Sequence, residues 1–400
     1  MCSGIPAPVI AASHFAESSQ PLKILHINTG LDTGGAELML ERLINASIKT
    51  AEFVHCVISL TAVGKVGTRL RQIGILVVAR EMRSVFSSIW VIWPLFRMIK
   101  KMKPDIVQTW MYHADLLGGI AARWAGVDRV IWGIRRTTLL THDPSTTRGV
   151  RGICAWLASR ISAVIACAAD AARQSYAAIG YPASPMMVIY NGFNGAVPSP
   201  TLDQRLAFRS QLGFGDKHIV IASLGRFTPA KHHANFIRAA ALVGKRLPHV
   251  LFLIVGRGID TTNASLKCQL DATGFSERFV LLGERSDVLN CYAAMDIFCL
   301  HSKTEGFPNV VGEAMAMGSP CVVTDVGDAA TLVATTGRVV ASSNAIELAD
   351  ALEQIATLST NVGHAMGLAA SCRRALSYSI KHAATEFEAR YRSLLPSVAR

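Results

Sequence analysis

Two carboxylates eight residues apart, Glu305 and Glu313, are the side chains whose spacing points most directly to chemistry. They enclose a turn-like stretch, Gly306-Phe307-Pro308-Asn309, and an apolar pattern with helical spacing follows it as far as Gly318. Proline suits the entry of a helix and glycine suits its exit. We therefore expect Glu305 in the loop before a helix and Glu313 about one turn inside it, roughly 5 Å further along the axis.

The start of this helix can bind a phosphate, because its first backbone N–H groups have no partner inside the helix. Two acids beside it can hold vicinal hydroxyls on a ribose and on a sugar. Loop, helix start and paired acids together predict a nucleotide-sugar site. The alternative is that Glu305 and Glu313 are solvated acids near a helix start, where the helix dipole favours negative charge.

A second set of residues has the opposite charge. Arg226 and Lys231 lie five residues apart in a loop that leads into another predicted helix. Two cations beside free N–H groups can neutralise a diphosphate leaving group, so we expect neither a metal nor a cofactor. A solvated basic helix start is the alternative, and the helix dipole disfavours it.

The elements that position these residues alternate between strand and helix, which is typical of doubly wound parallel sheets. Each half of the chain opens with a strand and a glycine-bearing loop, at residues 29–35 and 225–230. Strands are expected at 22–28, 53–60, 75–78, 106–109, 130–134, 163–167 and 187–190, and then at 218–224, 250–255, 279–282, 297–300, 321–324 and 337–340.

A turn-rich stretch at 191–200 marks a linker between two α/β halves. The length of 400 residues also exceeds the size at which one core usually stops growing. We expect an N-terminal domain at 1–195 and a C-terminal domain at 196–377. Ligands in open α/β sheets bind at the carboxyl ends of the strands, so the two halves imply a cleft between them.

Composition limits the class of protein. Half of the residues are apolar and 17% are charged, which indicates a globular chain with an ample core. The nine cysteines form no C-x-x-C pair, as expected for reduced thiols in a cytoplasmic protein. Residues 1–20 lack the basic start and the long apolar stretch of a secretory signal, and we take them as a leader that the fold does not need.

The net charge of +12 is uneven, because residues 1–195 hold 20 basic and 11 acidic residues against 20 and 17 in 196–400. A basic half predicts an anionic partner: a membrane surface, a phosphorylated acceptor or nucleic acid. We expect no nucleic acid, because no recognised binding motif accompanies the charge.

Residues 84–103 combine aromatic and basic side chains but are too short in their uncharged part to span a bilayer. They suit an element lying on an anionic membrane or, alternatively, an ordinary helix with a solvated basic end.

The segment 305–328 resembles the E-x7-E segment of the retaining glycosyltransferases of family four, which have the GT-B fold. The likeness implies two Rossmann-like domains facing a cleft, with a helix in 378–400 packing back on the first. It extends to the Arg226 and Lys231 spacing, which binds the donor diphosphate in that family. His232 stands where the family usually has glycine, and Asn194 replaces the aspartate of an N-G-x-D hinge.

The resemblance also assigns roles. Glu305 would approach the donor sugar or the reacting face, and Glu313 would hold the ribose hydroxyls. The glycine loops around Gly34, Gly256 and Gly283 would face donor phosphate and base. The donor-binding residues expected in full are Gly34, Gly35, Arg226, Lys231, Gly256, Gly283, Glu305, Gly306, Phe307, Pro308, Asn309, Val310 and Glu313.

The acceptor side is expected in the first domain. The family commonly has a histidine where Trp110 stands, and some members have one at the position of His113. We expect His113 to face the cleft as a fourth catalytic residue beside Glu305, Arg226 and Lys231; a buried structural histidine is the alternative. Arg135 and Arg136 are expected to bind an acceptor phosphate, or else form a solvated pair at a sheet edge.

Together these features imply a metal-independent, retaining hexosyltransferase that takes a UDP-sugar and acts on a lipid-linked or polysaccharide acceptor at the cytoplasmic membrane face. Front-face attack is the expected mechanism. Two alternatives stay open at this point: a sugar-nucleotide epimerase of the same fold and a non-catalytic sugar-binding protein.

Overall fold

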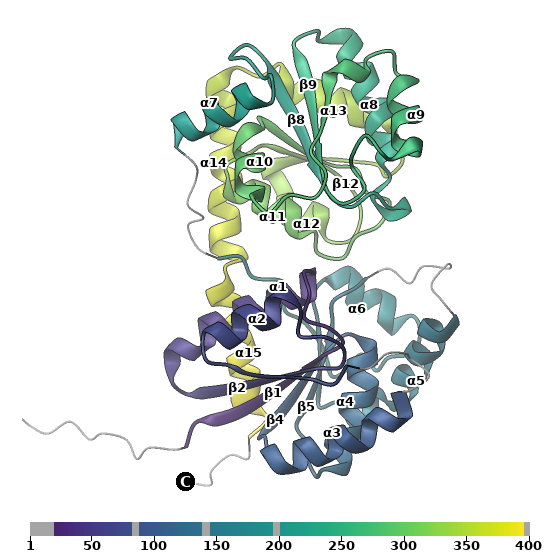
Figure 1. Ribbon diagram of the computed structural model, residues 1–400, viewed down its shortest axis with the longest axis vertical. Coiled ribbons are helices and arrows are strands. Elements are labelled where there is room, and N and C mark those ends of the chain that lie inside the picture. Colours follow the sequence, from purple (N-terminus) through teal and green to yellow (C-terminus); the bar gives the residue numbers. More distant parts are fainter. Residues whose placement is uncertain (1–19, 82–87, 138–144, 195–200, 396–400) are drawn as a thin grey trace, which may run out of the picture.

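The structure is a computed structural model that describes residues 20–81, 88–137, 145–194 and 201–395. Three segments for which the sequence makes a prediction lie partly outside these residues: the leader 1–20, the segment 84–103 and the linker 191–200. Within the described residues, two parallel sheets form two α/β domains stacked along the long axis of the molecule (Figure 1). The predicted fold class is confirmed.

The first sheet has seven strands in the order β3-β2-β1-β4-β5-β6-β7. Their neighbours pair in parallel, with Leu22 opposite Phe53 and Ile24 opposite Ile106. The strands are β1 (Leu22–Asn28), β2 (Phe53–Ser59), β3 (Leu76–Ala79), β4 (Ile106–Trp110), β5 (Val130–Ile134), β6 (Val164–Cys167) and β7 (Met186–Val188).

The second sheet has six strands in the order β10-β9-β8-β11-β12-β13, again parallel. The strands are β8 (Ile219–Leu224), β9 (Val250–Val255), β10 (Phe279–Leu281), β11 (Ile297–Leu300), β12 (Cys321–Thr324) and β13 (Gly337–Val340). In both sheets the strand order reverses beside the first strand, between β1 and β4 and between β8 and β11. Such a switch point opens a crevice at the carboxyl ends of the strands, and the residues predicted from sequence follow these strands.

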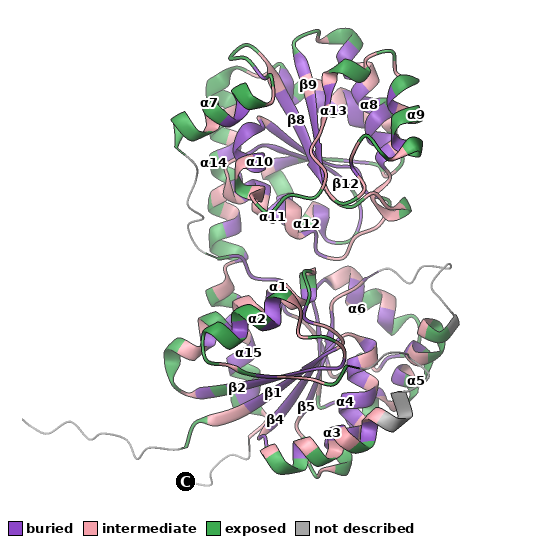
Figure 2. Cartoon of the chain, viewed as in Figure 1, coloured by how far each residue is buried: buried purple, intermediate pink, exposed green. Residues whose placement is uncertain are grey.

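Helices cover both faces of each sheet, so the central strands are buried along nearly their whole length (Figure 2). The first domain contains α1 (Gly35–Ser47), α2 (Gly64–Gln72), α3 (Ser88–Met102), α4 (Tyr112–Trp124), α5 (Ser145–Ile161) and α6 (Asp170–Ala177). The second contains α7 (Leu202–Gln211), α8 (His233–Arg246), α9 (Ala264–Asp271), α10 (Val288–Ala294), α11 (Asn309–Ala316), α12 (Ala329–Val333), α13 (Ala345–Ala356) and α14 (Thr360–Ser377).

The last helix, α15 (Ile380–Ser393), returns to the first domain (Figure 1). Its Phe387 and Tyr391 are buried in one cluster with Ile24 of β1. The two chain segments that cross between the domains are bonded to each other, since Phe193 N–H donates to Tyr378 O (2.9 Å) and Ile380 N–H to Phe193 O (2.7 Å). The domains are therefore joined at a paired, hinge-like crossing.

Six of the described strands (β1, β5, β9, β11, β12 and β13) have the expected limits, and the others differ by one or two residues at an end. The largest change is at β7, which ends at Val188 and not at residue 190. Tyr190 leaves the sheet because its ring packs 5.2 Å from that of Phe307 in the other domain. Among the described residues, no helix is both long and apolar enough to cross a membrane.

Candidate functional site

In the second domain, Lys231 and Glu305 meet although 74 residues separate them in sequence. Lys231 Nζ donates to Glu305 Oε1 at 2.5 Å, and Ser302 Oγ donates to the same oxygen at 2.6 Å. The two charged side chains are only 22% and 13% exposed. Glu305 therefore already has a cation and a hydroxyl as partners in this state.

His301 fixes the backbone of this site, a role that the sequence did not predict. Its Nδ1 lies 2.6 Å from Lys231 O and its Nε2 lies 2.7 Å from Ser223 Oγ at the end of β8. Burial lowers the pKa of His301 well below its usual value, so the ring is neutral. Because a carbonyl only accepts, Nδ1 carries the proton and Nε2 accepts from the serine. The position of His301 directly after β11 is the signal that could have found it.

His232 adopts a left-handed backbone conformation, with φ 53° and ψ 48°. Glycine has no penalty there, whereas other residues lose about 1 kcal/mol or more. A glycine at this position would form the turn without strain. His232 follows the same backbone path but strains it.

Helix α11 begins at Asn309, and Glu313 lies on its second turn. Both carboxylate oxygens of Glu313 have partners: Tyr292 Oη donates to Oε2 at 3.0 Å, and Arg42 Nη2 donates to Oε1 at 3.2 Å. Arg42 belongs to α1 of the first domain. The acid expected to hold a ribose is thus contacted from both domains.

Phe307 was expected among the donor-binding residues, but its side chain points elsewhere. It is buried against Tyr190, Phe193 and Tyr378, at ring distances of 5.2, 6.0 and 5.3 Å. These four rings form an aromatic cluster across the domain junction. Only the backbone of Phe307 is left for a donor contact, as for Pro308, which is also buried.

Two glycines in the predicted set allow close approach of backbone segments. A Cβ on Gly256 would lie 2.1 Å from Gly225 O, at the ends of β9 and β8. A Cβ on Gly306 would lie 2.7 Å from Thr137 Oγ1 in the first domain. Gly283 differs, since it has a φ of 63° and open space around it. Gly256 and Gly306 therefore shape the site, and Gly283 leaves room beside it.

The first-domain glycine loop faces the start of α11. A Cβ on Gly35 would come within 3.2 Å of Asn309 Nδ2. The carboxylate of Glu37 lies over Gly34, where an added Cβ would be 2.3 Å from Oε2. Burial raises the pKa of Glu37, although a hydrogen bond from its own backbone N–H opposes the shift. The sequence analysis missed Glu37, an acid in the first turn of a glycine-led helix.

On the acceptor side, Trp110 is fully buried and is not part of a binding surface. Its Nε1 lies 3.3 Å from His26 Nδ1, and His26 in turn bonds His55 at 2.9 Å. His113 is half-buried at the start of α4, and its Nε2 has no hydrogen-bond partner among the described residues. Burial lowers the pKa of His113, so the neutral ring predominates near neutral pH. Trp110 therefore belongs to the core, and His113 is the residue of this segment whose ring has a nitrogen without a partner in the described part of the chain.

Arg135 and Arg136 diverge in the structure. The guanidinium of Arg135 lies 4.8 Å from the ring of Trp110 and donates to Asn191 Oδ1 at 3.2 Å. Its Nε and Nη2 atoms are buried without a partner in the described part of the chain, and burial lowers its pKa to about 10. Arg136 donates to Tyr112 Oη at 3.3 Å. Arg135 is therefore not a solvated residue at a sheet edge.

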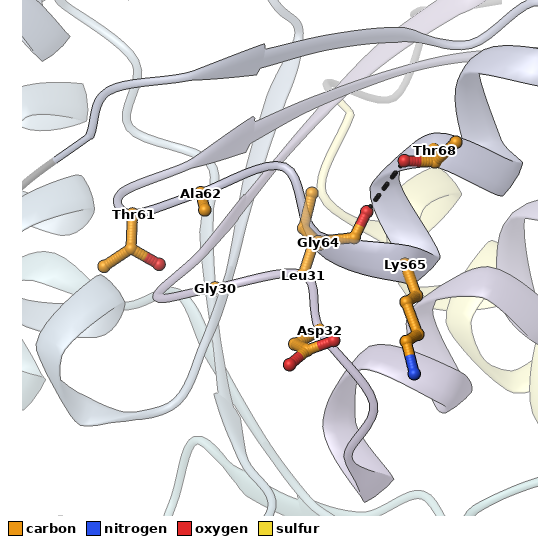
Figure 3. A pocket seen from close by; sticks show the side chains of 8 residues that line it. All are labelled: Gly30, Leu31, Asp32, Thr61, Ala62, Gly64, Lys65 and Thr68. Carbon is orange, nitrogen blue, oxygen red and sulfur yellow. Dashed lines mark hydrogen bonds between the residues drawn. The ribbon is translucent and has the colours of Figure 1, made fainter.

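A cavity of about 320 Å³ lies on the first domain beside the glycine loop (Figure 3). Asp32 and Lys65 project from its lining toward the same side. The lining residues are Gly30, Leu31, Asp32, Thr61, Ala62, Gly64, Lys65 and Thr68. Among the residues described, no three His, Cys, Asp or Glu side chains gather as ligands of a metal ion.

Two family models cover most of the chain. Residues 33–196 match the model described as Glycosyltransferase Family 4, and residues 218–357 match the model described as Glycosyl transferases group 1. The gap between the two matches, residues 197–217, includes α7.

Two relatives with known activities are similar over part of their length. The first is the UDP-Gal:alpha-D-GlcNAc-diphosphoundecaprenol alpha-1,3-galactosyltransferase of Escherichia coli, 29% identical over 254 residues, or 62% of each chain. The second is the GDP-mannose-dependent monoacylated alpha-(1-6)-phosphatidylinositol monomannoside mannosyltransferase of Corynebacterium glutamicum, 34% identical over 39% of this chain and 42% of that protein. The matches thus span less than two thirds of either relative.

Solved structures share the whole architecture. HepE of Anabaena, in complex with UDP and glucose, superposes with a TM-score of 0.81 at 22% identity, covering 93% of this chain and all of that one. The lipopolysaccharide outer core galactosyltransferase WaaB in its apo form gives a TM-score of 0.68 at 16% identity, covering 94% and 100%. At these identities the likeness concerns the fold.

Proposed function

The chain belongs to the family 4 glycosyltransferases, and we propose that it transfers a sugar from a nucleotide diphosphate to a hydroxyl group of a lipid-linked or polysaccharide acceptor. A UDP-sugar is the expected donor, in keeping with the UDP-Gal named for the Escherichia coli relative. The transfer proceeds with retention and without a metal.

The contact between Lys231 and Glu305 at the start of α11 supports the donor site most strongly. A diphosphate placed there would find Lys231, the exposed Arg226 on the same loop, and the free N–H groups of the helix start. The glycine loop of the first domain faces the same helix start through Gly35 and Asn309. Phosphate oxygens would then replace Glu305 as the partner of Lys231.

The largest charge change in the reaction is on the departing diphosphate. Fixed cations stabilise such a charge best when they are in place before the bond breaks. Arg226 and Lys231 supply them, and the leaving phosphate oxygen takes the acceptor proton on the front face. Glu305 keeps the hydrogen bond from Ser302 Oγ, and in this proposal it accepts hydrogen bonds from the sugar and does not act as a nucleophile. A glycosyl-enzyme trapped on Glu305 would overturn this mechanism.

The acceptor would enter from the first domain. The cavity that contains Asp32 and Lys65 offers a carboxylate for sugar hydroxyls and an ammonium for a phosphate. His113 and Arg135 each keep buried nitrogen atoms without a protein partner in the described residues. The Escherichia coli and Corynebacterium glutamicum relatives are both named for acceptors attached to a lipid by phosphate. We accordingly place a lipid-linked phosphate on this side.

Such an acceptor requires a membrane surface, and α3 has the composition to contact one. Trp93 is 59% exposed and stacks on Phe96 at 5.0 Å, and Lys100 lies over the same Phe96 ring. Exposed tryptophan beside lysine is typical of helices lying at an anionic interface.

Co-sedimentation with phosphatidylglycerol vesicles, but not with phosphatidylcholine vesicles, is expected for the wild-type protein and is expected to weaken in Trp93→Ser. Equal binding by both proteins would overturn the assignment.

Thermal unfolding with a panel of nucleotides and nucleotide sugars tests the donor site, with Glu313→Ala as comparison. A ligand at a hundred times its Kd adds about 2.7 kcal/mol to the free energy of unfolding. Stabilisation by UDP or a UDP-sugar that disappears in the variant supports the proposal. No stabilisation by any nucleotide would refute it.

Turnover with excess EDTA and the anomeric configuration of the product, read by NMR, then test metal independence and retention. Release of an altered nucleotide sugar without acceptor would instead indicate an epimerase.

A further inference from the structure

Glu313, the acid proposed to hold the donor ribose, is oriented by a residue of the opposite domain. Arg42 Nη2 donates to Glu313 Oε1 at 3.2 Å, and the two side chains are 17% and 30% exposed. Tyr292 Oη donates to the other oxygen from within the second domain. The carboxylate is therefore fixed from two sides, once from each domain.

Arg42 also contacts the segment that crosses between the domains. Its Nη1 donates to Gly192 O at 3.3 Å, and its guanidinium carbon lies 5.6 Å from the centre of the Phe193 ring. That ring in turn rests on α11, since a Cβ on Gly312 would lie 2.0 Å from it. Gly312 directly precedes Glu313. One guanidinium thus links α1, the crossing segment and the proposed ribose acid.

The arrangement leaves room for a ligand. An ionised carboxylate has about four lone-pair positions, and Arg42 and Tyr292 use one on each oxygen. The 3.2 Å contact is also longer than the 2.7–2.9 Å usual for a charge-assisted hydrogen bond. Arg42 therefore orients the acid without saturating it, and two ribose hydroxyls can still bind.

We infer that Arg42 is a positioning residue for the donor nucleotide: it holds Glu313 toward the ribose hydroxyls and makes that contact depend on the approach of the two domains. This rests on the proposed function of the site. Arg42 and Glu313 belong to different domains, so their contact exists only when the domains adopt this arrangement. A ribose that binds the oriented carboxylate will then favour the same arrangement, because a ligand shifts a protein toward the state that it binds better.

Calorimetric titration with UDP and with 2′,3′-dideoxy-UDP separates this role from a purely structural one. The proteins are wild type, Arg42→Met, Arg42→Lys and Glu313→Gln, with Arg69→Met as matched control. Arg69 pairs with Glu41 on the neighbouring face of α1, at 2.6 Å, and has no contact with the crossing segment within the described residues.

Arg42→Met is expected to bind UDP about tenfold more weakly, equivalent to about 1.4 kcal/mol, and to bind dideoxy-UDP within twofold of wild type. Arg42→Lys should recover part of the loss, since lysine keeps the charge without the two-pronged geometry. Arg69→Met should match wild type with both nucleotides.

Equal losses of both nucleotides in Arg42→Met would show a general effect on domain packing and would overturn the inference while leaving the donor site standing. Equal binding of UDP and dideoxy-UDP by wild type, unchanged in Glu313→Gln, would instead refute the ribose role of Glu313, and the inference with it. A wild-type protein that binds neither nucleotide would overturn both. Should Arg42→Met fail to fold, the same comparison is decided by Arg42→Lys, whose ribose-dependent loss is expected to be smaller but measurable.

Discussion

Replacing Lys231 with methionine separates what this side chain does for the fold from what it does for the reaction. The substitution keeps most of the side-chain volume and removes the charge. Glu305 is 13% exposed, and among the described residues only Ser302 Oγ then remains as a partner of the oxygen that Lys231 contacted. A carboxylate that loses its cation in a partly dehydrated site destabilises the folded state, because desolvation disfavours its charged form.

The size of the effect follows from the degree of burial. Breaking a fully buried pair costs about 3–5 kcal/mol, whereas an exposed pair contributes about 0.2–1 kcal/mol. With 22% and 13% exposure, this pair lies between these limits, and we expect a loss of about 2 kcal/mol in the free energy of unfolding. The double variant Lys231→Met/Glu305→Gln should recover most of this loss, because no unpaired charge remains.

Urea unfolding at pH 7.5 measures the stability of the single and double variants, and transfer kinetics measure the activity. Both variants are expected to lose roughly 10²–10³ in kcat, because the cation is missing from the transition state. Arg257→Met is the control, since it breaks an ion pair with Glu284 that lies in solvent on a neighbouring loop; no measurable change in stability is expected. A single variant as stable as wild type, or a double variant no more stable than the single, would refute the reasoning.

Three further predictions concern the rest of the fold. His232→Gly should raise the urea midpoint slightly, because it removes about 1 kcal/mol of left-handed strain and part of that gain is lost to the flexibility of glycine; a lower midpoint would contradict the strain. Burial lowers the pKa of His55 and of His233 to about 4 in the folded protein. The free energy of unfolding is therefore not reduced by these groups above pH 6.5. It falls as the pH drops from about 6.5 to about 4, by up to about 1.4 kcal/mol per pH unit for each histidine. A urea midpoint that stays constant between pH 7.5 and 5 would contradict this. Asp328→Ala removes a carboxylate that accepts from Asp170 N–H (2.7 Å) and Ala171 N–H (3.0 Å) across the domain junction. It should cost about 1–2 kcal/mol, measured by urea unfolding, and Asp325→Ala on the same loop is the control.

Several features followed from the sequence because short-range rules govern them. Strand positions came from continuous apolar runs bounded by turn residues, and β1, β5, β9 and β11 were predicted to the residue. The start of α11 after Pro308 was likewise predicted from a local signal. The parallel sheets followed from the alternation of these elements, since parallel neighbours need a crossover helix.

Tertiary structure alone decided which side chains share the site. The contact between Arg42 and Glu313 joins residues 271 positions apart, and no local pattern marks one helical arginine as the partner of a distant acid. Phe307 looked like part of a binding loop but packs into the aromatic cluster, and Arg135 looked exposed but lies against Trp110. Local propensity depends on a few neighbouring residues, whereas these contacts depend on how two whole domains pack. The sequence by itself therefore determined the helices and strands and the chemical types of the residues at their ends. The packing of the domains determined which of these residues contact each other.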